Sequence, residues 1–87
     1  MEINILKSSK EEVEVQIGSL TLAEILRVYL NKGQGVSFAA WKRSHPTEAP
    51  VLTVRTKGKT AKKAVDEAVK AIVKDLDKIE KDFEKLK

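Results

Sequence analysis

Four lysines, with a tryptophan earlier in the chain, are the residues whose types come closest to a chemical function. The lysines are Lys57, Lys59, Lys62 and Lys63, and the tryptophan is Trp41. Ammonium groups bind phosphate and an aromatic ring can stack on a base, so together they could bind DNA or RNA. Lys62 and Lys63 fall in the first turn of an expected helix, where the helix dipole disfavours cations unless an anion or an acidic protein surface compensates. Alternatively, the lysines are solvated and Trp41 packs against a helix.

The other ionisable residues do not form a pattern typical of catalysis or metal binding. The chain has no cysteine and one histidine, His45, without a partner at a spacing that suggests a catalytic triad. We therefore interpret His45 as a local hydrogen-bonding residue. The acids of the last third alternate with lysines, as solvated ion pairs on a helix do. The glycines match neither a phosphate-binding loop nor a dinucleotide fingerprint. We expect no catalytic residue, no metal site and no cofactor on this chain.

The length and composition are typical of one small globular domain, spanning residues 1–87. The chain is 41% apolar and 34% charged. Its formal net charge of +4 is concentrated in the middle, where eight basic residues between Lys32 and Lys63 face one acid, Glu48. We find no secretory signal and no stretch of ~18 apolar residues that could cross a membrane, so we expect a cytoplasmic protein.

Hydrophobic periodicity predicts the elements that would position these residues. Alternation around Ile3–Ile5 and Val13–Ile17 indicates an antiparallel pair of strands, and Val36–Lys42 and Val51–Thr56 indicate two more. Between the two pairs, apolar residues recur with helical spacing from Leu22 to Leu30. A second helix follows Thr60, a good N-cap, and nothing interrupts it as far as Lys87. The expected fold is α+β, a four-stranded, mostly antiparallel sheet with two helices on one face.

The start of the first helix also carries a capping pattern. Thr21 is followed three residues later by Glu24, which predicts a capping box with Thr21 as the N-cap. The apolar face of this helix is wide and comprises Leu22, Ile25, Leu26, Tyr29 and Leu30. Either one flank packs on the sheet and the other on a neighbouring chain, or all of these residues are core.

The second helix carries an apolar stripe that outlasts the domain. Its members are spaced by 3.5 residues on average, as in a heptad seam: Val65, Ala68, Ile72, Leu76, Ile79, Phe83 and Leu86. About 27 helical residues make a rod of roughly 40 Å, whereas a compact chain of this length has a diameter of about 30 Å. We expect the rod to overhang its domain and a partner chain to cover the stripe. The alternative is that the tail frays and folds back on its own sheet.

Two motifs, in this order of elements, resemble those of subunit L of archaeal DNA-directed RNA polymerase. The first is the run Leu20-Thr21-Leu22-Ala23-Glu24-Ile25-Leu26 at the start of the first helix. The second is Phe38-Ala39-Ala40-Trp41-Lys42 followed by His45-Pro46. The opening run Met1 to Lys7 is similar as well, and the resemblance spans essentially the whole chain.

The resemblance implies a non-catalytic assembly subunit with the dimerisation fold of the bacterial alpha subunits. Family members form a heterodimer with the larger D subunit of the polymerase, and this heterodimer is a platform for the catalytic subunits in transcription. This chain would then belong to a nucleotidyltransferase only as part of the complex, would contact further polymerase subunits, and would meet nucleic acid only indirectly.

Three hypotheses about function follow. The first is binding to the D subunit through residues of both helices: Leu22, Ile25, Leu26, Tyr29, Ile72, Leu76, Ile79 and Phe83. The second is a small basic nucleic-acid-binding α/β module that uses Trp41 and the four lysines. The third is a homodimer of the isolated chain, formed through the same stripe.

Overall fold

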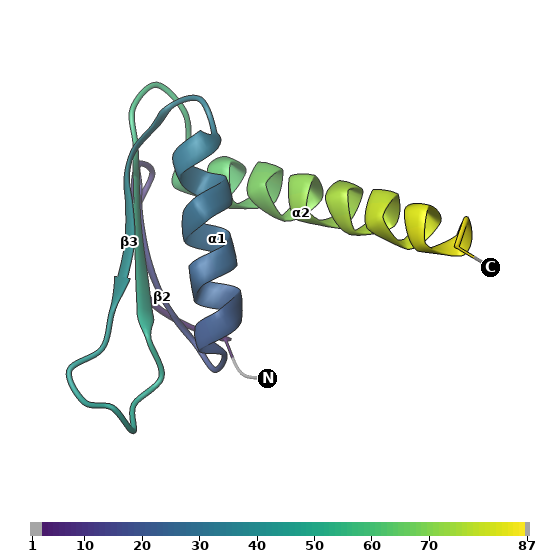
Figure 1. Ribbon diagram of the computed structural model, residues 1–87. Helices are drawn as coiled ribbons and strands as arrows, with labels where there is room; N and C mark the ends of the chain where they lie inside the picture. Colours follow the sequence, from purple (N-terminus) through teal and green to yellow (C-terminus); the bar gives the residue numbers. More distant parts are fainter. Residues whose placement is uncertain (1–2, 87) are drawn as a thin grey trace.

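The computed structural model describes residues 3–86 and contains four strands and two helices (Figure 1). Their order along the chain is the predicted one, two strands and a helix, then two strands and a helix. The elements are β1 (Ile3–Ser8), β2 (Glu12–Ile17), α1 (Leu20–Lys32), β3 (Val36–Lys42), β4 (Val51–Thr56) and α2 (Ala61–Glu84). The predicted fold class is confirmed.

The four strands form one antiparallel sheet in the order β1-β2-β4-β3. β2 and β4 are therefore the inner strands, and β1 and β3 are the edges. β1 reaches Ser8, and its register with β2 shifts between Ile5 and Lys7 before the pairing resumes. The expected alternation ends at that irregularity.

α1 begins earlier in the chain than its capping pattern predicts. The capping box at Thr21 is wrong, because the helix starts at Leu20 and Ser19 is the N-cap. Ser19 is extended, and its hydroxyl accepts a hydrogen bond from the backbone N–H of Leu22 at 3.1 Å. The carboxylate of Glu24 is bound by side chains instead of the backbone. At the other end, Gly33 caps the helix and donates its N–H to the carbonyl of Leu30.

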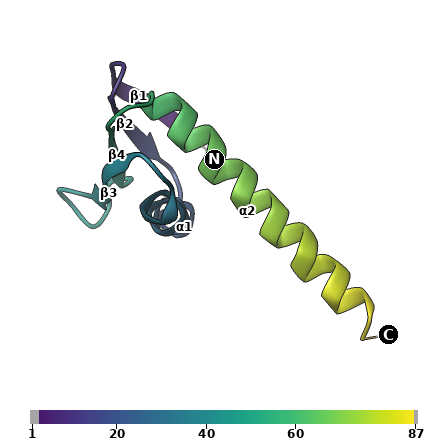
Figure 2. The same cartoon turned by 90° about the horizontal axis from the view of Figure 1, so that it is seen from above.

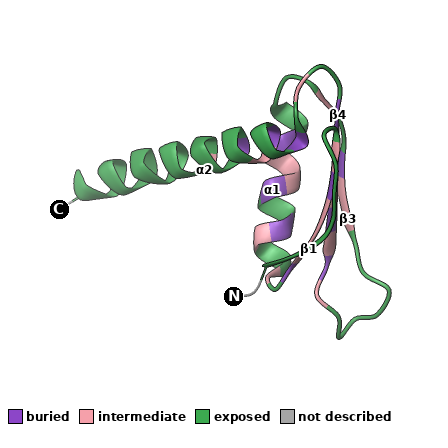
Figure 3. Ribbon diagram, turned by 180° about the vertical axis from the view of Figure 1, so that it is seen from behind, coloured by how far each residue is buried: buried purple, intermediate pink, exposed green. Residues whose placement is uncertain are grey.

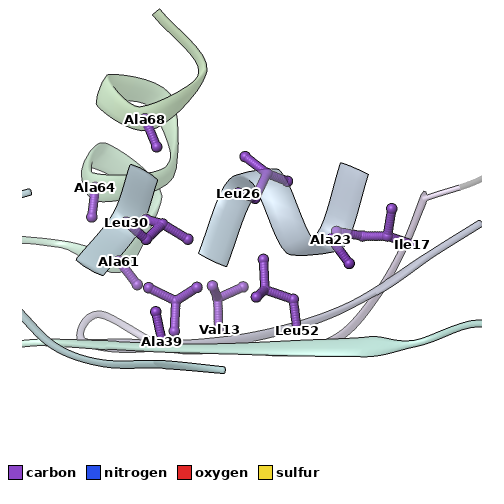
Figure 4. Packing of buried hydrophobic residues seen from close by; sticks show 11 residues of the cluster. Val13, Ile17, Ala23, Leu26, Leu30, Ala39, Leu52, Ala61, Ala64 and Ala68 are labelled. Atoms are coloured by element: carbon purple, nitrogen blue, oxygen red, sulfur yellow. The ribbon is translucent and has the colours of Figure 1, made fainter. Parts of the chain in front are cut away.

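The core lies between the sheet and the two helices (Figure 4). Large buried side chains come from the sheet and from α1, among them Ile17, Leu30, Leu52 and Val54. The buried residues of α2 are all alanines, Ala61, Ala64 and Ala68. Small side chains let this helix approach the body closely, but only over its first two turns.

Beyond these alanines α2 leaves the body (Figures 1 and 2). Its 24 residues make a rod of about 36 Å. The molecule measures 46 × 35 × 16 Å and has a radius of gyration of 14.3 Å, compared with about 12 Å for a compact chain of this length. The predicted overhang is therefore confirmed, and the tail does not fold back on the sheet.

Candidate partner-binding surface

The part of α2 beyond the body exposes a row of large apolar side chains. Figure 3 shows this part of the helix as continuously exposed. The first turns, which carry the buried Ala61, Ala64 and Ala68 and which we call the root of α2, differ in this respect. We call the row the tail stripe and define it as Leu76, Ile79, Phe83 and Leu86, whose exposed fractions are 58%, 49%, 64% and 77%. The last of these lies in the turn that follows the end of α2 at Glu84. Ile72, one turn nearer the body, is half-buried. Val69 and Val73 are also exposed and widen the apolar surface next to the stripe.

The outer side of α1 adds apolar residues to this candidate surface, and Tyr29 is the one that contacts α2. Ile25 is exposed, and Leu22 and Tyr29 are half-buried at the margin of the core. Leu26 differs, because it is 6% exposed and packs inside the core. At this exposure its side chain offers almost no surface to a partner. Of the four residues of α1 that we expected to bind a partner, Leu22, Ile25 and Tyr29 are accessible and Leu26 is buried.

A hydrogen bond joins the two helices where α2 leaves the body. The hydroxyl of Tyr29 donates to Oδ2 of Asp75 at 2.7 Å. This bond to a carboxylate raises the pKa of Tyr29, because ionising the phenol would lose the donor. The ammonium of Lys32 lies 5.3 Å from the centre of the Tyr29 ring, in cation–π range. The Tyr29–Asp75 bond joins α1 to α2, whereas the cation–π contact lies within α1.

An open cleft of about 290 Å³ lies beside this bond, between the end of α1 and the root of α2. Its apolar wall includes Leu30, Val36 and Ala68, and Lys59 and Glu67 stand at its margin. The two helices are thus in contact at their crossing but are not packed together along their length.

The edge strand β1 adds exposed apolar residues that the sequence pattern did not predict at a surface. Ile3 pairs with Ile17 and Ile5 pairs with Val15, so both isoleucines lie on the sheet face that carries the helices. Ile17 is buried, but Ile3 and Ile5 are 58% and 69% exposed. The alternation of the first strand contained this signal, but the edge position of β1 depends on strand order, which the alternation does not give.

The lysine cluster and Trp41 do not come together. Lys59 pairs with Glu67, and its aliphatic stem packs against Gly35, while Lys57, Lys62 and Lys63 are exposed. Trp41 pairs in register with Leu52, four residues along β4 from Thr56, where the lysine segment begins. At about 3.4 Å per residue this separates the tryptophan from the lysines by more than about 13 Å along the strand.

Trp41 instead contacts α1. Its indole N–H donates to Oε1 of Glu24 at 2.9 Å, and Arg27 binds both carboxylate oxygens of Glu24 at 2.7 Å. The hydrogen bonds from Arg27 and then from Trp41 lower the pKa of Glu24 from its ordinary value to about 2. The alternative that Trp41 packs against a helix is the one that the structure supports.

Residues 3–86 contain no cluster of three or more side chains that could hold a metal ion. His45 is exposed in the loop between β3 and β4, where its backbone carbonyl accepts the N–H of Glu48. Over the same residues, neither helix combines the length and the apolar character that crossing a bilayer demands.

Comparison with known proteins places this surface in a family context. Residues 11–82 match the family model of the RNA polymerase Rpb3/Rpb11 dimerisation domain. The chain is 34% identical to DNA-directed RNA polymerase subunit Rpo11 of Sulfurisphaera tokodaii, over 98% of this chain and 88% of the relative. It is 39% identical to the Rpo11 of Saccharolobus islandicus, over 83% and 79% of the two chains.

The fold agrees with a solved structure. DNA-directed RNA polymerase subunit L of Thermoplasma acidophilum superposes with a TM-score of 0.85 at 23% identity, over 97% of this chain and 86% of that chain. The match confirms the four-stranded sheet with two helices as the subunit L fold. On the strength of the matched domain and of the Rpo11 relatives, this chain belongs to the Rpb3/Rpb11 dimerisation domain family and, within it, with the archaeal Rpo11 (L) subunits of RNA polymerase.

Proposed function

We propose that this chain is a non-catalytic assembly subunit of DNA-directed RNA polymerase that forms a heterodimer with the D subunit of the enzyme. The heterodimer is the platform on which the catalytic subunits assemble, and its place of work is the cytoplasm. The chain meets nucleic acid only through the assembled enzyme. The observation that carries the proposal is the tail stripe, a row of large apolar side chains that its own domain does not cover.

The free energy gained by burying the tail stripe favours the binding of a partner. Covering a side chain such as leucine or phenylalanine removes apolar surface from water and contributes about 1.5–3 kcal/mol per residue. Single exposed apolar residues are ordinary, but a contiguous row marks an interaction surface. The dimerisation domain that matches residues 11–82 includes most of α2. The membership in a dimerisation family and the uncovered helix thus support the same conclusion from independent observations.

The proposed contact surface has two parts that meet at an angle. One part is the tail stripe with Ile72, and the other is the α1 flank of Leu22, Ile25 and Tyr29. The Tyr29–Asp75 bond joins the two helices where these parts meet, so a partner helix could contact both parts at once. Leu26 contributes indirectly, by packing α1 on the sheet.

Two substitutions in the tail stripe test this proposal. Ile79→Asp with Phe83→Asp puts two charges where the partner would bury apolar surface, so we expect the variant to lose co-purification with the D subunit from the same organism. A matched control, Lys78→Asp with Lys81→Asp, puts two aspartates on the other side of α2 and should keep the complex. Both pairs are exposed, so circular dichroism of the isolated variants should stay that of the unmodified chain. An intact complex with the Ile79 and Phe83 variant would refute the proposal.

A further inference from the structure

The charges on the projecting part of α2 are sorted around the tail stripe. Residues three or four apart are neighbours on a helix surface. Asp82, for example, stands three residues after Ile79, so it adjoins that side chain. The same spacing makes Asp75 a neighbour of Ile79 and makes Glu80 a neighbour of Leu76 and Phe83. Three exposed acids, which we call the acidic border, thus adjoin the stripe on its two sides: Asp75, Glu80 and Asp82.

The lysines of the same segment lie elsewhere on the helix. They follow one another at intervals of four, three and four residues and so form a row of their own: Lys74, Lys78, Lys81 and Lys85. No member of this row stands three or four residues from a member of the tail stripe, so the row occupies the opposite side of α2. Two further acids, Asp77 and Glu84, are likewise not neighbours of the stripe.

The net charge of this segment is close to zero, so the charge that a partner meets depends on where each charged residue lies on the helix. Lysines and acids from residue 74 to residue 86 are almost equal in number, but a partner lying on the stripe meets only the acids. Charges that border an apolar seam pair with charges on the facing helix and determine which partner fits. We infer that the partner segment covering the tail stripe is an amphipathic helix whose own apolar face is bordered by lysine or arginine. This inference rests on the proposed heterodimer and specifies the chemistry of its other half.

The same arrangement disfavours a second copy of this chain. Two tail stripes packed face to face would bring two acidic borders together, and like charges across an interface oppose association. The acidic border therefore selects against the homodimer while it favours a basic partner helix. We expect the isolated chain to sediment as a monomer at low salt.

Reversal of the border charges tests the inference, with the affinity for the purified D subunit as the readout. The border variant is Glu80→Lys with Asp82→Lys. Its matched control, Asp77→Lys with Glu84→Lys, changes the total charge by the same amount away from the stripe. At low salt we expect the border variant to bind about tenfold more weakly than the unmodified chain, and the control to differ by no more than about threefold. At about 1 M salt the Debye length falls to about 3 Å and charge interactions are largely screened, so the affinities should converge.

The outcomes separate this inference from the proposed function. Equal weakening by both variants, an unchanged affinity of the border variant, or a dimer of the unmodified chain alone at low salt would each overturn the acidic-border inference while leaving the heterodimer standing. If the unmodified chain does not bind the D subunit at either salt concentration, the proposed function itself is refuted. Circular dichroism of both variants checks that the helix content is preserved.

Discussion

Glu24 on α1 forms hydrogen bonds within the chain that connect this helix to β3. Its carboxylate lies on the flank toward β3, where Arg27 and the only tryptophan both donate hydrogen bonds to it. A glutamate three residues after Thr21 is a capping signal in the sequence, but the backbone N–H at the start of the helix is satisfied by Ser19 instead. Both Ser19 and Thr21 have the right hydroxyl for a cap. The choice between them depends on where the chain leaves β2, which residue types alone do not determine.

This arrangement predicts an acid transition that tryptophan fluorescence can follow. Because the pKa of Glu24 is lowered, the ionised carboxylate stabilises the fold above its ordinary pKa of 4.5, and that contribution is lost as the pH falls through about 2. We expect the fluorescence of Trp41 to change with a midpoint near pH 2. The control, Glu24→Gln, should abolish the transition. A midpoint near 4.5 in the unmodified chain would show that the hydrogen bonds do not hold Glu24 in its ionised form.

At the scale of elements, α2 has two regions with different tasks. Its root buries alanines against the sheet and α1, whereas its tail exposes larger side chains. The apolar spacing is the same throughout, so it predicted the helix and its overhang but not the residue at which the helix leaves the body. The point at which the helix leaves the body is indicated instead by the size of its apolar side chains. Ala64 and Ala68 can approach another element closely, and Leu76 and Phe83 are too large for such a contact.

The two regions should respond differently to substitution, with urea denaturation of the isolated chain as the measurement. Ala64→Leu adds volume at a position that is 2% exposed, so we expect it to lower the free energy of unfolding by about 1–3 kcal/mol. Leu76→Ala removes an exposed side chain and should change that free energy by no more than about 0.5 kcal/mol, while weakening the complex with the D subunit. A large loss of stability from Leu76→Ala would show that the tail is packed within its own chain.

At the scale of the molecule, features that depend on neighbouring residues can be predicted from the sequence, whereas features that depend on contacts between distant segments cannot. Local periodicity predicted all six elements, because alternation and helical spacing are properties of neighbouring residues. It did not predict the strand order β1-β2-β4-β3, which depends on pairing between distant segments. That order places Ile3 and Ile5 at an edge, where neither helix covers them. The family resemblance pointed to partner binding, but the accessible residues emerged only from the fold.

Whether another polypeptide covers the projecting part of α2 is tested most directly by amide hydrogen exchange. Amide hydrogen exchange of the isolated chain should be fast in residues 76–84 and slow in β2 and β4, because the helix beyond the Tyr29–Asp75 bond projects from the body and those strands are the inner ones. On addition of the D subunit, we expect exchange in residues 76–84 to slow markedly while β2 and β4 change little. Unaltered fast exchange of the tail within an intact complex would contradict the account.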